Sequence, residues 1–341
     1  MKRILQILLP AFIVVAGSAH AIDAIPEKPG WHGFLMLGAG VLQAETNMVA
    51  GIDLYSIDIG NARIDSVGEE PEKKSILIPQ VNFNVNYTFS TQTQLFLGNS
   101  LENIVQLDTV TIGGVRQQFS DKSILELGFV SSPMLAPVQV WADPYVVGVD
   151  RVKTDRTSRG IRLEYDKILG SGFGVRLEQR ETEIDNELSG TTGGLGLTAA
   201  EAELMKRSGD VKSLLAYYRF SPVGRNVFEL RLGYGTDDLD GKAMSGDRNL
   251  GQLTYAYFGK RFISTANVSY MKQEFDAVNP VFNQLRDDKS LGLAFFLFDK
   301  DLFNSKQWWG QASLVWIGKD SNIDFYDQSS SVLTAGVKYT F

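Results

Sequence analysis

The chain has 341 residues, of which 33 are Lys or Arg, 40 are Asp or Glu, and none is Cys. The acidic balance and the lack of a basic cluster argue against nucleic-acid binding, and the absence of Cys removes disulfides, thiol catalysis and Cys-based metal sites. After the N-terminus no segment approaches about 18 continuous apolar residues, which excludes transmembrane helices there.

The N-terminus has the pattern of a cleavable secretory signal. A basic pair precedes an apolar run over residues 4–15, and Ala19 and Ala21 are small residues at the positions that a signal peptidase reads. The run is shorter than the roughly 20 residues that span a bilayer, which argues against the alternative, a membrane anchor. We therefore expect residues 1–21 to be a signal peptide and residues 22–341 to form one domain. Cleavage removes two positive charges and no negative ones, which changes the net charge from −7 to −9.

The chain after the signal alternates between apolar and polar residues. A first strand is expected near Gly33–Thr46, and the clearest pattern lies in Ile76–Phe89. One face of the latter carries Val81, Phe83, Val85, Tyr87 and Phe89, and the other carries Asn82, Asn84, Asn86 and Thr88. A period of two indicates an extended strand, and a face made of amides and a hydroxyl suits a wet interior. A large soluble sandwich has a similar composition, and the two ends of the chain favour a membrane barrel instead.

The connections between these strands alternate in length. The short ones are Ser90–Thr91, Ser120–Lys122, Leu169–Gly172, Ser221–Arg225, Gly259–Lys260 and Asp299–Lys306. The long polar ones are Asn47–Lys74, Glu102–Asp108, Ser132–Asp155, Asn186–Asp210, Asp237–Arg248, Asp276–Asp288 and Lys319–Ser329. Short periplasmic turns and long extracellular loops are typical of outer-membrane barrels, in which the strand number is even.

The expected strand number is about fourteen, with twelve as the alternative. The uncertainty comes from two segments with irregular alternation, Gln94–Asn99 and Val110–Gln118. Gly113 and Gly114 within the second segment indicate a β-bulge. The fold class is thus all-β, a transmembrane antiparallel up-and-down barrel.

The C-terminal residues 332–341 again alternate, and the chain ends on Phe341 with Tyr339 two residues before it. This ending resembles the terminal strand by which barrel-assembly machinery recognises outer-membrane barrels. Aromatic residues also gather next to the short turns, where they are expected to form a girdle at the lipid interface: Trp31, Tyr87, Phe89, Tyr218, Phe220, Tyr257, Trp308 and Tyr339.

The start of the mature chain resembles a family of proteobacterial outer-membrane barrels with porin-like character. The residues that carry the resemblance are Pro29, Gly30, Trp31, Gly33, Gly38, Gly40 and Asn47. These are structural motifs. The resemblance implies a barrel in the cell outer membrane, in contact with lipid and lipopolysaccharide, and it brings no substrate and no catalytic residue with it.

The middle strands carry charged residues on the face that is expected to line the lumen: Arg162, Glu164, Asp166, Arg176, Glu178, Arg180, Arg219, Glu229 and Arg231. In lipid each charge would cost about 2–4 kcal/mol near the bilayer midplane, so the alternation places them inside. Two interpretations remain open. The charges form a lining that selects solutes by charge, or they are ion pairs that brace the interior.

The sequence gives little support for catalysis, a cofactor or a metal. The mature chain has one histidine, His32, beside Trp31, and such a residue is more often at the interface than a general base. The acidic segments 237–241 and 320–324 lack the full pattern of a Ca²⁺ loop, and surface solubility explains them. Residues 198–207 have helical propensity within a long loop, and this helix and the Asn47–Lys74 loop lie either outside the barrel or in its lumen.

The sequence therefore predicts a non-enzymatic outer-membrane barrel without a cofactor. The first functional hypothesis is a porin-like passive channel for small polar solutes. The alternative is a non-conducting barrel that displays its loops for adhesion, envelope integrity or binding. An outer-membrane hydrolase is the third and least supported hypothesis.

Overall fold

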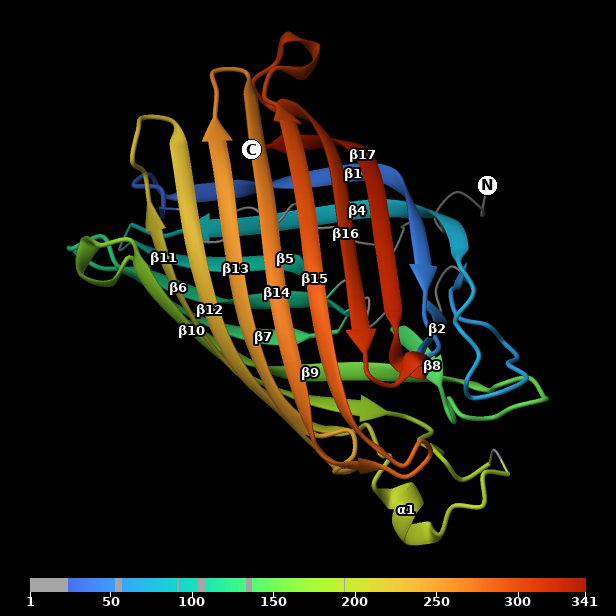
Figure 1. Cartoon of the computed structure of the whole chain (residues 1–341). Coiled ribbons are helices and arrows are strands. Elements are labelled where there is room, and N and C mark those ends of the chain that lie inside the picture. Colours follow the sequence, from blue (N-terminus) through green and yellow to red (C-terminus); the bar gives the residue numbers. More distant parts are fainter. Residues whose placement is uncertain (1–23, 53–56, 91, 104–107, 133–136, 193) are drawn as a thin grey trace, which may run out of the picture.

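The computed structural model describes residues 24–52, 57–90, 92–103, 108–132, 137–192 and 194–341, except for the side chains of residues 100–109. The expected signal peptide, with Ala19 and Ala21, lies outside the described residues. Within them, fourteen long antiparallel strands form a closed wall (Figure 1). These strands are β1 (Gly30–Glu45), β4 (Lys74–Thr88), β5 (Thr93–Asn103), β6 (Asp108–Gln118), β7 (Ile124–Ser131), β9 (Lys153–Asp166), β10 (Phe173–Ile184), β11 (Gly209–Phe220), β12 (Asn226–Leu239), β13 (Gly246–Phe258), β14 (Phe262–Asn279), β15 (Gln284–Asp299), β16 (Trp308–Ser321) and β17 (Gln328–Thr340).

The barrel closes because its first and last strands pair. β1 and β17 run side by side in continuous register from Phe34 opposite Thr340 to Glu45 opposite Ser329. The other long strands pair with their neighbours in the chain, so the wall has no exposed edge. The expected count of fourteen is confirmed, and the alternative of twelve is wrong.

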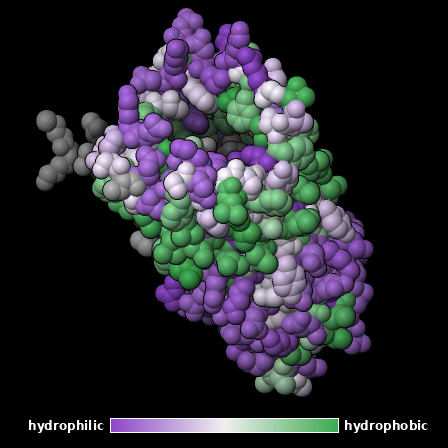
Figure 2. Space-filling model, turned by 90° about the vertical axis from the view of Figure 1, so that its left-hand side faces the viewer, coloured by the Kyte–Doolittle hydropathy of each residue, from purple (hydrophilic) through white to green (hydrophobic). Residues whose placement is uncertain are grey.

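The wall is polar inside and apolar outside, which is the reverse of a soluble protein. On β12, Glu229 is 0% and Arg231 is 7% exposed, whereas Leu230 between them is 46% exposed. The same alternation recurs around the barrel, where outward leucines, isoleucines and valines form a broad apolar surface. Green patches of hydrophobic residues lie on the barrel wall in Figure 2. Such a band suits the hydrocarbon core of a bilayer.

Aromatic side chains form a chain of contacts near the short turns. The rings of Phe173 and Tyr218 lie 4.5 Å apart, those of Phe220 and Phe228 lie 5.5 Å apart, and that of Tyr255 lies 5.1 Å from Phe228. Further ring contacts join Trp31 to Tyr87, Tyr87 to Phe89, and Trp308 to Tyr339. This arrangement matches the expected aromatic girdle.

Two details differ from the expectations. No bulge lies at Gly113 and Gly114, because β6 keeps continuous register there with β5 and β7. A Cβ on Gly114 would lie 2.1 Å from the carbonyl oxygen of Leu127, so this glycine serves close strand approach instead. The register shift of this hairpin lies at the loop end, between Leu101 and Asn103.

Several loops are also shorter than expected. The loop between β12 and β13 covers only residues 240–245, and that between β14 and β15 only residues 280–283. The strands continue past the apolar band, and their polar ends had the composition of a loop. The strands of this chain therefore extend beyond the part of the barrel that carries the apolar band.

The long loops carry the remaining short elements, which are β2 (Val49–Ile52), β3 (Ile57–Asp58), β8 (Val138–Trp141), α1 (Ala199–Glu203) and the 3-10 turn η4 (Asp324–Tyr326). Two further 3-10 turns, η2 (Ile168–Gly170) and η3 (Leu302–Asn304), lie in short connections. β8 pairs with both β2 and β9, which ties the first loop to the wall. In the described part of the chain, no helix has both the length and the apolar character needed to cross a bilayer.

Candidate functional site

A cavity of about 960 Å³ lies inside the barrel. It extends from Ala24 and Thr340 near the short turns to Met48 and Met244 at the loop end. Figure 2 shows a hollow at the end of the molecule that carries the short turns. The lumen is therefore a hollow space and not a packed core.

The side chains around this cavity are predominantly basic. Eleven of the lining residues are Arg or Lys, and four are Asp or Glu: Glu126, Glu164, Glu178 and Asp237. The whole chain, by contrast, has a net charge of −7. The barrel thus separates charge, with a cationic interior inside an acidic protein.

The predicted lumen charges all lie on inward-facing positions. Six of them border the cavity, namely Arg162, Glu164, Arg176, Glu178, Arg180 and Arg231, whereas Asp166, Arg219 and Glu229 do not. Glu164 is directly opposite Arg176 in the register of β9 and β10, and Arg162 is opposite Glu178. Their ion pairs are 2.7 Å and 2.5 Å long.

Three carboxylates in the lumen wall are each shared by two cations. Glu178 binds Arg162 at 2.5 Å and Arg180 at 2.8 Å. Glu229 binds Arg231 at 2.5 Å and Arg219 at 2.8 Å. Each of these clusters has two cations and one carboxylate, so its net charge is +1.

Asp288 forms the third such cluster, with Arg286 at 2.5 Å and Lys319 at 3.3 Å. These residues lie at the loop ends of β15 and β16. Two simpler pairs complete the wall, Arg116 with Glu126 at 2.6 Å and Arg248 with Asp237 at 2.8 Å. These residues were not among the predicted lumen charges. Glu126 could have been found from its spacing, because it alternates with the outward Leu125 and Leu127.

Tyr217 holds the carboxylates of β9 in place. Its hydroxyl donates hydrogen bonds to Glu164 at 2.8 Å and to Asp166 at 3.0 Å. The guanidinium of Arg231 lies 5.5 Å from the centre of the Tyr217 ring, within the range of a cation–π contact. The wall formed by β9 to β12 is therefore a connected network.

The other side of the lumen carries many neutral polar groups beside its cations. Amide and hydroxyl side chains from β4, β13, β14 and β15 line it, namely Asn82, Asn84, Asn86, Gln252, Asn267, Ser269 and Ser290. Such groups accept and donate hydrogen bonds without a fixed charge. A solute in the lumen would meet the guanidinium groups of β9 to β12 on one side, and amides and hydroxyls with Arg286, Lys319 and Lys338 on the other.

The loop end of the cavity is bounded by a folded cap. We define the cap core as the buried cluster of Ile64, Tyr145, Met205, Ala243, Met244, Ile323, Phe325 and Tyr326. Met48 packs against this cluster and, with Met244, also lines the cavity. The cap is therefore the boundary that a solute would reach at the loop end.

Polar contacts inside the cap are nearly all buried. The hydroxyls of Tyr145 and Tyr326 lie 2.6 Å apart, and burial raises the pKa of both phenols, so both stay protonated. Arg151 donates to the carbonyl oxygens of Asn47 at 3.1 Å and Pro144 at 3.0 Å. Burial lowers the pKa of Arg151 to about 10, which leaves the guanidinium charged at neutral pH.

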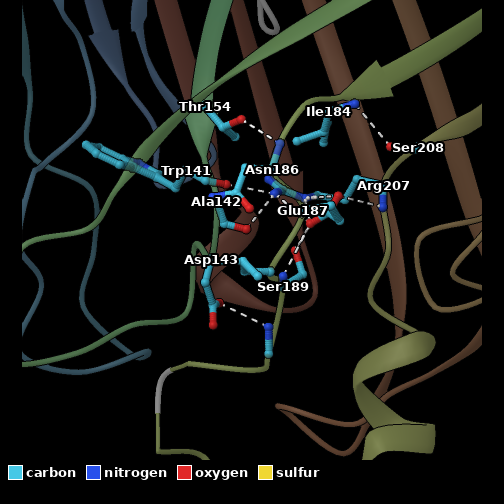
Figure 3. Close-up of polar contacts among 12 residues, drawn as sticks. Trp141, Ala142, Asp143, Thr154, Ile184, Asn186, Glu187, Ser189, Arg207 and Ser208 are labelled. Atoms are coloured by element: carbon cyan, nitrogen blue, oxygen red, sulfur yellow. Dashed lines mark hydrogen bonds and ion pairs between the residues drawn. The ribbon is translucent and has the colours of Figure 1, made fainter.

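A second set of contacts fastens the loop 185–208 to the loop that contains Trp141 (Figure 3). Arg207 forms an ion pair of 2.9 Å with Glu187, and these side chains are 7% and 10% exposed. Arg207 also donates to the carbonyl oxygen of Trp141 at 2.7 Å. Asp143 accepts a hydrogen bond from the backbone of Gly190 at 3.0 Å. We call Arg207, Glu187 and their carbonyl partners the loop clasp.

The expected alternatives for the loops can now be decided. The Asn47–Lys74 loop contributes Met48 and Val49 to the cavity lining and Ile64 to the cap core. Helix α1 is capped by Thr198 and Glu201 and lies on the outer side of the cap, while Met205 beyond its end is buried (Figure 1). The loops thus fold over the mouth of the barrel.

The opposite end is crossed by the N-terminal strap, which we define as residues 24–29. Ile25 is buried against Ile124 at the start of β7, and its amide donates to Gln118 at 3.2 Å. The strap continues into β1, and both Ala24 and Pro26 line the cavity. His32 also borders the cavity, with its Nε2 3.2 Å from the carbonyl oxygen of Lys28.

The predicted assembly residues lie at the end of β17. The ring of Tyr339 contacts that of Trp308 at 4.9 Å and stacks on that of Phe341 at 6.3 Å. Their place in the aromatic girdle is a structural fact, and their recognition by assembly machinery stays a prediction.

The comparison with known families identifies the chain. Residues 30–340 match the family model described as "Protein of unknown function (DUF2860)". The chain belongs to the DUF2860 family. No curated protein matches the sequence of this DUF2860 chain.

Several solved structures are similar to the DUF2860 chain at low identity and with TM-scores below 0.5. OmpTdeltaL8, a loop-deletion mutant of the outer membrane protein OmpT of Vibrio cholerae, is 11% identical with a TM-score of 0.41, over 91% of this chain and 99% of that one. The toluene transporter TodX of Pseudomonas putida is 10% identical with a TM-score of 0.45, over 92% and 90%. The CymD monoaromatic hydrocarbon channel is 12% identical with a TM-score of 0.41, over 91% and 88%.

Proposed function

We propose that this DUF2860 protein is a passive channel for small polar solutes in the bacterial outer membrane. The observation that carries the proposal is the cavity of about 960 Å³ along the barrel interior, lined by charged and amide side chains. Fourteen strands lie between the eight-stranded barrels that are filled by side chains and the larger porins that hold an aqueous channel. The apolar band and the aromatic girdle support a place in the membrane.

The decisive experiment is single-channel recording of refolded residues 22–341 in a planar bilayer. The proposal expects discrete conductance steps from a barrel whose folding is verified by its heat-modifiable migration in gels. A matched sample of heat-unfolded protein should give no steps. Folded protein that never conducts in either orientation would overturn the channel.

A second function is favoured by the loop cap. The cap core and the loop clasp give the outer end of the barrel a fixed shape, as a platform for binding other molecules requires. In that case the folded protein would be silent in the bilayer, and whole cells bearing it would differ in adhesion or envelope integrity from cells whose cap core is disrupted.

The remaining expectations are also proposals. We infer that barrel-assembly machinery and lipopolysaccharide are partners, and that the protein is not an enzyme. A panel of lipid and peptide substrates tests the last point, and turnover that depends on a cavity residue would overturn it.

A further inference from the structure

We propose that the lumen is selective for small oxyanions, which are carboxylates or phosphates, and that the basic stripe along β9 to β12 makes this selection. The inference rests on the proposed channel and names its solute class. It is carried by the sign and the layout of the charges that line the cavity.

The basic residues follow the barrel axis. β9 runs toward the short turns, and β10 and β12 run away from them, so the position of a residue along its strand gives its depth. Arg231 and Arg176 lie toward the short turns, Arg162 and Arg180 lie deeper, and Arg207 lies at the cap. An anion would thus find a guanidinium group at each depth of the lumen.

The positive excess does not depend on any single cation lacking a partner. Glu178, Glu229 and Asp288 are each shared by two cations, so each cluster keeps a net positive charge while its members remain ion-paired. A low-dielectric wall focuses such a field into the lumen, where it raises the local concentration of counter-ions. The acidic character of the chain as a whole would favour cations. The sign of the ion selectivity therefore shows whether the lumen charges or the surface charges control permeation.

Guanidinium groups suit oxyanions in particular. The planar fork of N–H donors matches the spacing of carboxylate and phosphate oxygens. Arg286 already binds Asp288 in this way, with one donor to each carboxylate oxygen. The amide N–H groups of the opposite wall can donate to the remaining oxygens of such a solute. A solute anion would exchange briefly with Glu178 or Glu229 for the shared guanidinium groups.

The test is the reversal potential of the full mature channel in a KCl gradient, followed by potassium acetate and potassium phosphate in place of KCl. We expect anion selectivity that weakens as the salt concentration rises. The Debye length is about 10 Å at 0.1 M and becomes shorter at higher concentration, so the lumen charges are then screened more strongly. Permeation by acetate, by phosphate or by both supports the proposal, and the relative permeabilities show which oxyanion it is. Cation selectivity, or an anion selectivity restricted to chloride, would overturn it.

The variants Arg180→Gln and Arg231→Gln locate the selection. Each leaves its carboxylate with one cation, Arg162 for Glu178 and Arg219 for Glu229, so folding should be preserved. The double variant should lower the anion-to-cation permeability ratio by about twofold or more, as expected for charges that lie within a few ångströms of the path.

The matched control is Arg159→Gln. Arg159 lies on β9, three residues from Arg162, and pairs with Glu181 at 3.0 Å on the exposed face, where the side chains are 66% and 56% exposed. This change removes a charge of the same sign from the same part of the wall but outside the lumen, so the ratio should not move. An equal effect of Arg159→Gln would overturn the role of the stripe. A folded protein without conductance would instead refute the channel itself.

Discussion

Glu229 shows how a single residue holds the lumen wall together. Its side chain is fully buried and accepts from Arg219 on the neighbouring strand and from Arg231 two residues along its own strand. Two guanidinium groups therefore depend on one carboxylate. Because a buried charge without its partner is costly, the carboxylate matters more for stability than either arginine.

Replacing Glu229 by Gln should lower the free energy of unfolding by on the order of 3 kcal/mol, because the buried guanidinium of Arg231 and the partly buried one of Arg219 lose their counter-charge. Urea unfolding of the refolded barrel in lipid vesicles, followed by tryptophan fluorescence, measures the change. Glu181→Gln serves as the control, since its partner Arg159 stays in solvent, and it should leave the midpoint unchanged. Equal midpoints for the two variants would contradict this account.

The loops and the strap are the elements that decide how the two ends of the barrel behave. The loop clasp joins residues 185–208 to Trp141 and Ala142, while α1 contributes only a short exposed turn. The strap at the other end is held chiefly by one apolar side chain and one hydrogen bond. The cap should therefore be rigid and the strap easily released.

Arg207→Ala should loosen the cap without unfolding the wall. The change leaves Glu187 buried without its cation and frees the carbonyl oxygens of two residues, so the loop 185–208 should exchange its amide hydrogens faster and become sensitive to protease. The neighbouring Lys206→Ala is the control, because Lys206 pairs with Glu203 at the surface. Undiminished protection of the loop in the Arg207 variant would show that the apolar core alone holds the cap.

Ile25→Ser should release the strap from the mouth. The loss of its contact with Ile124 should expose the peptide bond after Glu27 to endoproteinase Glu-C, and the conductance should rise because Ala24 and Pro26 leave the cavity. Ile25→Val keeps the apolar contact and should behave as the native chain. Protease resistance of the Ser variant would mean that other contacts of residues 24–29 hold the strap.

At the scale of the whole molecule, closure of the barrel depends on the seam between β1 and β17. Gly38 lies directly opposite Gly336 across this seam. A Cβ on Gly38 would lie 2.4 Å from the carbonyl oxygen of Ala335 and 2.8 Å from the Cα of Gly336. The strands can meet at this distance only because neither residue has a side chain.

Gly38→Ala should therefore impair closure, at a cost on the order of 1–3 kcal/mol, as expected for overpacking. The yield of the heat-modifiable form after refolding measures it. Gly251→Ala is the matched control on β13, where a Cβ meets nothing within 4 Å. Similar yields for both variants would mean that the seam adjusts to a methyl group.

The sequence was sufficient for the wall but not for what the wall encloses. Alternation identifies the inward charges one strand at a time, and it correctly gave fourteen strands. It cannot give the stagger between strands, so the sharing of Glu229 by Arg219 and Arg231 was out of reach. The cap core was also hidden, because Tyr145 and Phe325 are 180 positions apart and neither lies in a periodic segment. Polar strand ends had the composition of loops, which explains the overestimated loop lengths.

The composition of the cap core has a consequence for the order of assembly. Its members come from loops spread between Ile64 and Tyr326, so no few neighbouring hairpins can bury it. In the outer-membrane setting proposed above, each loop must cross the bilayer before its apolar residues can meet those of the others. The cap can therefore form only after the last hairpin is in place and the wall is shut. The burial of Tyr145 and Tyr326 at the loop end would then show that the barrel has closed.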